Sequence, residues 1–404
     1  MKKYFLAVAS FFIYSHISLG QVYPGQMDST FVPVRSHHYD PELTFDFCVN
    51  EPAWSNQAGI HSAFGSTDRL YFRKEVPVNH DNDLSSSYST TVWRGERANA
   101  QILVWSSEAL EQVRVSTQDL RSAEGNIIPK DRITFELVRY VLSNYPYAEK
   151  KAICGESPYK SGFLMPDRFE TLDRFDLPSQ TTRPVWMMVD VPRGTAPGTY
   201  KGKVEVRAKG KAPQLLNLEI VVQNQLLPYP KDWKYRLDLW QNPWAVAWYN
   251  HVEPWSPEHK MLLKQHLKHY ADAGGTYITT YGVHSPWSDN SYMIEGGMIE
   301  WIKKADGTWA FDYKIFDEYV ELAMECGIDE AITLYTPIPW GFRHRYKDEA
   351  TGDYSYINWA PSSEEFKKMW NIFLTDFKFH LEAKSWLDIT YIGINENPME
   401  ETLA

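Results

Sequence analysis

The chain has 404 residues, 23% of them charged, and a formal net charge of -11. This length accommodates two or three domains of about 100–200 residues each. Such an acidic surface would repel phosphate backbones, so nucleic acid is excluded as an expected partner, and neutral ligands remain open.

Residues 1–20 have the pattern of a secretory signal peptide. Two lysines precede an apolar run over 4–14, and Ser18 and Gly20 supply the small residues of a cleavage site. The run is shorter than the about 20 residues that cross a bilayer, so no membrane span is predicted. No cysteine follows the cleavage site to carry a lipid, and we therefore expect a periplasmic or secreted location.

The N-terminal domain is predicted to be an all-β sandwich over 21–228, with 21–86 as an irregular lead-in. β-branched and aromatic runs alternate with turn residues and show no helical periodicity. The clearest of these runs cover 91–94, 100–105, 184–192, 200–208 and 215–222. The prolines at 228 and 230 oppose both helix and sheet, so a linker is expected there.

The C-terminal domain, 229–404, changes to alternating strands and helices. Strand-like runs cover 235–240, 277–281, 331–338 and 388–394, and helical patterns lie between them. Such alternation predicts a parallel sheet, and the leading fold is an incomplete (β/α)8 TIM-type barrel. Because only about four strands fit, the C-terminal half of the barrel is expected to be missing. A small open α/β domain is the alternative.

Three cysteines, Cys48, Cys154 and Cys326, allow one disulfide at most, and three buried free thiols explain them equally well. No motif typical of a metal site, a phosphate-binding loop or a nucleophilic serine is present. We therefore expect neither a metal nor a cofactor.

Tryptophan is concentrated in the C-terminal domain, where 12 of the 16 lie after residue 230. A Trp-rich core accounts for several of them. The functional interpretation is a cleft lined by aromatic rings, on which the C–H faces of sugars pack while polar tips bind hydroxyls.

Polar and aromatic residues gather where the predicted strands end. In parallel α/β folds the site lies at the carboxyl ends of the strands. Those ends supply candidate sugar-binding residues: Trp240, Gln241, His284, Trp287, Tyr335 and Trp340. The last strand ends at Asn395 and Glu396.

Glu396 is the candidate catalytic residue. Burial among aromatic rings would raise the pKa of its carboxyl, which could then protonate a glycosidic oxygen and later deprotonate water. The alternative is a solvated turn, because Asn395, Glu396, Asn397 and Pro398 also suit a turn.

Several segments resemble glycoside hydrolase family 123 and its Bacteroidetes relatives. The resemblance extends from about residue 90 and is densest after 235. It is carried by 237–243, 278–280, His284, 286–287, 306–309, 311–313, 338–340, 388–390, Glu396 and 398–400. It implies a β-sandwich before a barrel and removal of terminal β-linked N-acetylgalactosamine. It also implies a substrate-assisted retaining mechanism, in which the sugar's acetamido oxygen attacks the anomeric carbon and the Glu is the acid/base.

One position departs from the family pattern. Where the family has Asp-Glu, this sequence has Asn395 and Glu396, and Asn397 stands where an Arg is expected. A neutral amide can orient the acetamido group, but it brings no negative charge to the oxazolinium. The resemblance therefore leaves three hypotheses: a hexosaminidase, an impaired or truncated glycan-binding remnant, and a two-carboxylate retaining glycosidase whose nucleophile lies beyond residue 404.

Overall fold

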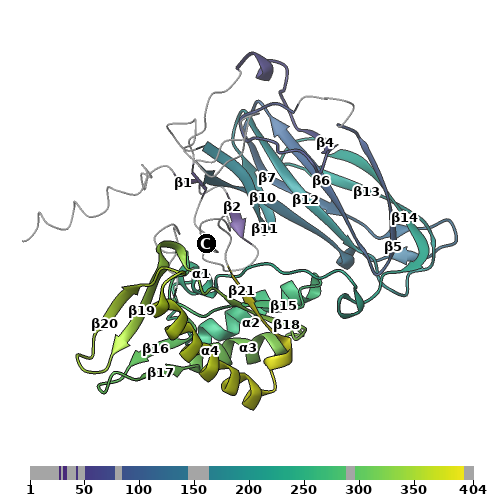
Figure 1. Ribbon diagram of the computed structural model, residues 1–404. Helices are drawn as coiled ribbons and strands as arrows, with labels where there is room; N and C mark the ends of the chain where they lie inside the picture. The colour runs from purple at the N-terminus through teal and green to yellow at the C-terminus, as the bar shows by residue number, and fades with distance from the viewer. Residues whose placement is uncertain are drawn as a thin grey trace, which may run out of the picture. The chain divides into compact units, whose positions relative to one another are not determined.

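The computed structural model describes residues 27–28, 31–33, 42–43, 51–77, 84–143, 163–287 and 296–394. The predicted signal peptide, Cys48, Cys154, Asn395 and Glu396 lie outside these residues. The chain divides into two compact units, Met1–Leu227 and Pro228–Ala404, which are described separately (Figure 1). None of the described helices is long and apolar enough to span a membrane.

The described residues of the N-terminal unit form β-strands and two short 3-10 helices. The strands before the long ones are β1 (Met27–Asp28), β2 (Phe31–Pro33), β3 (Glu42–Leu43) and β4 (His61–Gly65). The others are β5 (Ser87–Arg94), β6 (Arg97–Ser106), β7 (Leu110–Thr117), β8 (Leu120–Arg121), β9 (Ile127–Ile128), β10 (Ile133–Ser143), β11 (Phe163–Leu177), β12 (Thr181–Asp190), β13 (Gly198–Arg207) and β14 (Gln214–Leu226). The 3-10 helices are η2 (Glu51–Trp54) and η3 (Lys130–Arg132).

Alternation of apolar and polar residues places one face of each strand in the core. In β14, Leu216, Leu218, Ile220 and Val222 are all buried, while the residues between them are more exposed. A strand turns successive side chains to opposite faces, so this pattern fixes which face of β14 packs inward. The same core contains Ile102 of β6, which is fully buried.

Twelve of these described strands form one sheet, in the order β4-β6-β12-β10-β11-β7-β13-β14-β5 with β2, β8 and β9 attached, and β1 pairs with β3 in a separate two-stranded sheet. β11 connects its two parts, because 163–171 pairs with β10 and the end of the strand pairs with β7. β4 and β5 are the two edge strands of this order, and they are joined by a bridge between Phe64 of β4 and Ser85, just before β5. The expected sandwich of two separate sheets is therefore wrong: one nearly closed sheet surrounds the core.

The C-terminal unit contains two sheets and four α-helices among its described residues. The helices are α1 (Pro243–Tyr249), α2 (Pro257–Asp272), α3 (Lys314–Glu325) and α4 (Glu364–Lys384). The strands are β15 (Tyr277–Tyr281), β16 (Glu300–Lys303), β17 (Trp309–Asp312), β18 (Ala331–Tyr335), β19 (Arg343–Asp348), β20 (Tyr354–Asn358) and β21 (Thr390–Gly393). Short 3-10 helices are η4 (Pro230–Asp232), η6 (Trp340–Phe342) and η7 (Leu387–Ile389).

The helices begin at side-chain caps and bury one apolar face. Ser256 accepts a hydrogen bond from the backbone N–H of His259 at the start of α2, and Ser363 accepts one from Phe366 at the start of α4. Along α4 the buried side chains are those of Met369, Trp370, Phe373, Phe377 and Leu381. Their helical spacing directs this face into the core of the unit.

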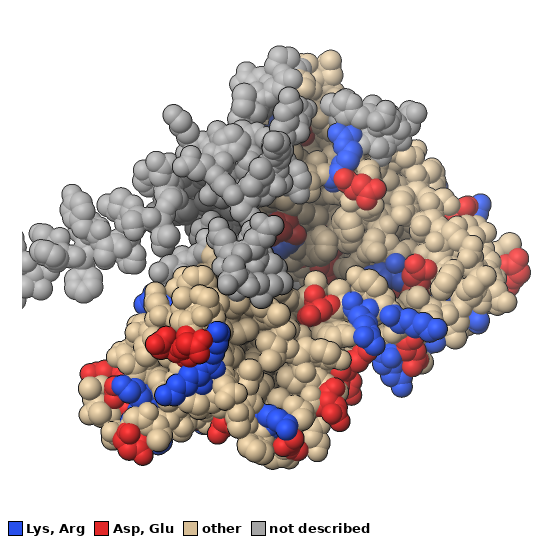
Figure 2. Space-filling view, viewed as in Figure 1, with Lys and Arg blue, Asp and Glu red and all other residues tan. Residues whose placement is uncertain are grey.

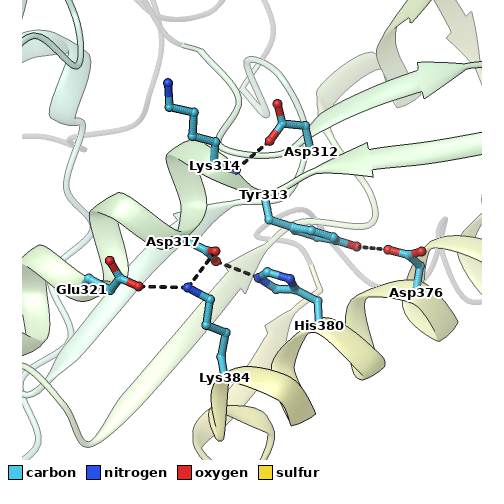
Figure 3. Close-up of polar contacts among 8 residues, drawn as sticks. All are labelled: Asp312, Tyr313, Lys314, Asp317, Glu321, Asp376, His380 and Lys384. Carbon is cyan, nitrogen blue, oxygen red and sulfur yellow. Dashed lines mark hydrogen bonds and ion pairs between the residues drawn. The ribbon is translucent and has the colours of Figure 1, made fainter.

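Polar contacts also join α3 to α4. The carboxylate of Asp317 on α3 accepts hydrogen bonds from His380 at 2.7 Å and Lys384 at 2.9 Å, both on α4 (Figure 3). Beside them, the hydroxyl of Tyr313 donates to Asp376 at 2.7 Å. These residues form a polar cluster next to the apolar contact between the two helices.

The expected TIM-type barrel is wrong. The parallel sheet has three strands in the order β15-β18-β21, and the described residues contain no closed barrel. The predicted first strand, 235–240, makes only an isolated bridge between Leu237 and Gly275. An alternating sequence specifies that strands can pair in parallel, but it does not specify how many join. Nothing in the described residues supports the expected missing half of a barrel.

A second sheet, with the order β17-β16-β19-β20, was not anticipated from the sequence. β16 and β17 meet at a turn in which Gly307 has a φ of 84°. The side chain of Asp306 accepts hydrogen bonds from Thr308 in that turn. Trp301 of β16 is 2% exposed and its ring stacks on that of Phe373 at 4.7 Å, so this sheet packs against α4.

Candidate active site

The site is built around the carboxyl ends of β15 and β18. These strands are parallel neighbours, and their last register pair is Tyr281 with Tyr335. Side chains that follow each strand therefore emerge at the same edge of the sheet.

An aromatic cluster lies at this edge. The ring centroid of Tyr335 is 4.9 Å from those of both Trp240 and Trp287, and the two indoles are 5.7 Å apart. Tyr281 adds an edge-on contact with Trp287 at 5.3 Å. Three candidate sugar-binding residues from three separate segments therefore lie together.

Trp240 provides the open ring of this cluster. It is 47% exposed, whereas Tyr335 is 2% exposed. A ring that is fixed by neighbouring rings and open to solvent can stack on the apolar face of a sugar. The tryptophans after residue 230 therefore fall into two groups. Some belong to the core, such as the buried Trp301, Trp370 and Trp386, and others, such as Trp240, are open to solvent.

Gln241 is held beside the cluster through its backbone. Its carbonyl oxygen accepts a hydrogen bond of 2.8 Å from the Tyr281 hydroxyl. Its side-chain amide donates to the carbonyl of Leu239. The segment before it is anchored by Tyr270, whose hydroxyl oxygen lies 2.7 Å from the carbonyl oxygen of Leu237 and 3.0 Å from that of Tyr277. The segment 237–241, which makes only an isolated bridge to the sheet, is thus held beside β15 by these hydrogen bonds.

His284 follows β15 and is held neutral. Burial, helped by the guanidinium groups of Arg345 and Arg343, lowers the pKa of its imidazole to about 4. At neutral pH the ring is therefore uncharged and has one donor and one acceptor nitrogen. Such a group suits hydrogen bonding to sugar hydroxyls.

Trp340 lies beside the loop that follows β15. Its backbone N–H donates to the carbonyl of Pro286 at 2.8 Å. The structure thus brings five of the six predicted sugar-binding residues to the ends of β15 and β18 or to the segment beside them, and it attaches Trp340 to the same loop through its backbone.

Asp238 was missed as a candidate in the sequence. Burial raises the pKa of its carboxyl, while a hydrogen bond of 3.4 Å from the Thr279 hydroxyl opposes this rise. An acidic residue between Leu237 and Leu239 in an otherwise apolar run was the available signal. The carboxyl group of Asp238, with its raised pKa, therefore lies beside β15.

Asn395 and Glu396 lie outside the described residues. β21, the strand directly before them in sequence, pairs with β18 up to Gly393 opposite Tyr335. The hydroxyl of Thr336 donates to the carbonyl of Ile394. The described chain therefore ends at the same edge of the sheet as the aromatic cluster.

No group of three or more His, Cys, Asp or Glu side chains that could hold a metal is found in the part of the chain that the structure describes. Cys326 is buried as a free thiol. The arrangement combines an open indole, a neutral imidazole and an exposed carboxyl, which together suit a polar ligand with apolar faces.

Family comparisons match both units. Residues 64–208 match the glycoside hydrolase 123 N-terminal domain, and residues 240–404 match the glycoside hydrolase 123 catalytic domain. No protein of curated function matches the chain.

A family 123 glycoside hydrolase from Clostridium perfringens, described for glycolipid glycan hydrolysis, is similar in structure. It has 27% sequence identity and a TM-score of 0.76, over 85% of this chain and 59% of that protein. This chain thus spans less than two thirds of the relative. A Bacteroides ovatus GH5 xyloglucanase matches with 9% identity and a TM-score of 0.19, over 77% of this chain and 43% of that one. This likeness is too weak to indicate a shared fold or function.

Proposed function

This chain resembles glycoside hydrolase family 123 in both of its domains, and from that premise we propose that it is a glycoside hydrolase that removes terminal β-linked N-acetylgalactosamine or a related N-acetylhexosamine. The observation that carries the proposal is the aromatic cluster of Trp240, Trp287 and Tyr335 at the carboxyl ends of parallel strands. The open face of Trp240 would receive the sugar ring, and His284 and Gln241 would bind its hydroxyls.

The proposed chemistry is substrate-assisted. The acetamido oxygen of the sugar attacks the anomeric carbon, and Glu396 donates its proton to the departing glycosidic oxygen. The oxazolinium intermediate is then opened by water, from which Glu396 removes a proton. Asn395 orients the acetamido group through its amide.

Hydrolysis of a chromogenic β-N-acetylgalactosaminide by the purified chain tests this proposal, beside a Glu396→Gln variant. We expect turnover in the parent and a loss of at least about 100-fold in the variant, because general acid/base catalysis contributes about 10²–10⁴-fold. Glu364→Gln is the matched control, because it removes the same charge at a side chain of α4 that is 86% exposed. Equal turnover in the parent and the Glu396 variant would remove Glu396 from the mechanism.

The second candidate function is glycan binding without turnover. It is favoured by the neutral Asn395 in place of the Asp of the family pattern. It predicts binding of N-acetylgalactosamine to the parent chain with no hydrolysis, and a gain of activity in Asn395→Asp. Export to the periplasm or outside the cell, as the first 20 residues predict, would place either activity where extracellular glycans occur.

A further inference from the structure

Two aromatic side chains lie together on one face of the large sheet. Trp186 of β12 and Phe169 of β11 stand on either side of β10, where their register partners are Glu136 and Val138. Their ring centroids are 5.4 Å apart, and the ring planes are inclined by 27°. Met187, next to Trp186, is fully buried in the core, so the ring pair lies on the opposite face of the sheet, here called the outer sheet face.

The ring pair is open to solvent and forms one continuous apolar surface. Phe169 is 42% exposed, and Trp186 is partly exposed. Val138, which lies between their strands on the same face, is only 5% exposed. Contact between the two rings fixes their orientation before any ligand binds. A fixed and exposed ring can stack on the apolar C–H face of a sugar with little loss of side-chain entropy.

Hydrogen-bonding groups lie on both sides of Trp186, because β12 lies between β6 and β10. The indole N–H donates to Oδ1 of Asn99 on β6 at 3.2 Å. This contact fixes the orientation of the Asn99 amide, whose Nδ2 makes no hydrogen bond to the residues that the structure describes. On β10, Glu136 accepts a hydrogen bond of 3.2 Å from the Thr171 hydroxyl through Oε1. The outer sheet face thus presents amide donors and a carboxylate acceptor beside the rings, and sugar hydroxyls use both kinds of group.

The charges on this face favour an uncharged ligand. Arg97 of β6 binds Asp190 of β12 through two hydrogen bonds, of 2.6 and 3.2 Å, so this cation is already paired. Glu136 adds a negative charge beside the rings. The charged residues of 1–227 sum to zero, and on the side shown in Figure 2 basic and acidic side chains of the N-terminal unit lie next to one another. A neutral sugar therefore suits the face better than an anion does.

The apolar area of the ring pair matches a sugar rather than a protein. One aromatic side chain buries about 150–250 Å². A stable protein interface buries about 800 Å² on each partner and has an apolar centre. The rings are flanked by polar side chains, those of Asn99, Glu136 and Thr171, so their apolar surface is the size of one or two sugar rings.

We propose that the outer sheet face binds a neutral glycan, with one sugar ring stacked on Phe169 and Trp186 and its hydroxyls bonded to Asn99 and Glu136. The residues of this site belong to the N-terminal unit, whereas those of the candidate active site belong to the C-terminal unit. Binding here requires no hydrolysis, so the proposal goes beyond the proposed function and does not depend on it. In a glycoside hydrolase, a second site of this kind would hold the chain on a branched or polymeric glycan.

The indole N–H of Trp186 reports binding at this face. In a ¹H–¹⁵N NMR spectrum of the full chain, its signal is assigned by its loss in Trp186→Phe. The chain is then titrated with four neutral disaccharides: lactose, chitobiose, cellobiose and mannobiose. We expect at least one of them to shift the signal in a saturable manner. No shift with any of the four would overturn the proposal.

Variants test whether the shift arises at the outer sheet face. Phe169→Ala removes one exposed ring of the pair and is expected to weaken binding by about two- to tenfold. Asn99→Asp keeps an oxygen for the Trp186 indole but removes the amide donors, so a loss of about two- to tenfold is expected there too. Trp93→Ala is the matched control, because Trp93 is an aromatic side chain on β5 that is 40% exposed. Unchanged binding in both Phe169→Ala and Asn99→Asp would contradict the proposal.

Three further measurements separate the alternatives. Trp240→Ala alters the candidate active site and should leave the Trp186 shift unchanged, whereas a lost shift would mean that the signal reports binding in the C-terminal unit. Dilution without sugar should not move the signal, and a movement would show that the face is instead an interface between copies of the chain. Sialyllactose should bind no more tightly than lactose does, and tighter binding would overturn the choice of a neutral ligand. Each measurement is read without turnover, so a failure of the proposed hydrolase activity would not change it.

Discussion

At the scale of single residues, Trp240 combines exposure with a fixed position. Its ring is 47% exposed and contacts two other rings of the aromatic cluster. It belongs to a segment with only one bridge to the sheet, so its position depends on these ring contacts and on the anchoring of the backbone by Tyr270 and Tyr281.

Trp240→Ala is expected to weaken the binding of N-acetylgalactosamine by about two- to tenfold, because stacking on an aromatic ring contributes about 0.5–1.5 kcal/mol. Calorimetric titration measures the change. Trp248→Ala is the matched control, because Trp248 on α1 is 57% exposed and no ring contact with the cluster is found for it. An equal loss in both variants would show that Trp240 has no specific role.

His344 is a buried neutral histidine. Its Nδ1 lies 3.1 Å from the carbonyl of Phe342, and its Nε2 accepts a hydrogen bond of 3.3 Å from the indole of Trp370. These contacts fit a neutral ring with the proton on Nδ1. Burial lowers the pKa of His344 to about 4.

This depressed pKa predicts a loss of stability in acid. Between pH about 6.5 and about 4 the unfolded chain binds a proton at this position and the folded chain does not, so the free energy of unfolding falls as the pH falls. The expected contribution is about 2–3 kcal/mol over that range. Urea unfolding from pH 7 to pH 4 measures it, and His344→Phe should have a shallower pH dependence than the parent. A Phe379→Ala variant, altered at an exposed position of α4, should keep the dependence of the parent.

At the scale of elements, the polar cluster between α3 and α4 fixes how the helices meet. Asp317 accepts hydrogen bonds from two α4 side chains, and Lys384 also reaches Glu321 of α3 at 2.9 Å (Figure 3). The ring of His380 stacks on Tyr313 with centroids 4.0 Å apart. Asp317 is thus the common acceptor of the cluster.

Asp317→Ala is expected to lower the free energy of unfolding by about 1–3 kcal/mol, because two charged or polar donors lose their partner where solvent is limited. Glu321→Ala should cost at most about 1 kcal/mol, because its side chain is 56% exposed. Chemical denaturation of both variants measures the difference. Equal costs would mean that the cluster contributes only as surface ion pairs do.

At the scale of the whole molecule, the chain has two hydrophobic cores that share no residue. One lies within the large sheet and includes Ile102, and the other includes Phe316, Trp370 and Phe373. The formal net charge of -11 belongs to the C-terminal unit, because the charged residues of 228–404 sum to -11 and those of 1–227 sum to zero.

Phe373→Ala tests the second core. The side chain is fully buried, and its removal is expected to cost about 3–5 kcal/mol in the C-terminal unit. Calorimetry should show a lower melting temperature for the transition of that unit. Phe379→Ala on the same helix is the matched control, because Phe379 is 64% exposed and its loss should change stability by less than about 1 kcal/mol.

Helix starts depend on local sequence, whereas strand pairing does not. The helix starts at Ser256 and Ser363 depend on local sequence alone, because a cap is a contact between residues three positions apart. The strand at 235–240 was wrong, because pairing depends on a partner that is distant in sequence. The sheet of β16, β17, β19 and β20 was missed for the same reason: β16 and β19 pair across about forty residues of sequence.

For the candidate site, the sequence by itself determined which residues follow strands, since Trp287 and Tyr335 come after apolar runs, and it carried the family resemblance. Only the tertiary structure decided that Trp240, Trp287 and Tyr335 touch, that His284 is neutral, and that one nearly closed sheet and an open parallel sheet form in place of a sandwich and a barrel. Local patterns encode the direction of side chains and the ends of helices. Strand partners and burial depend on the free energy of contacts between segments far apart in the chain.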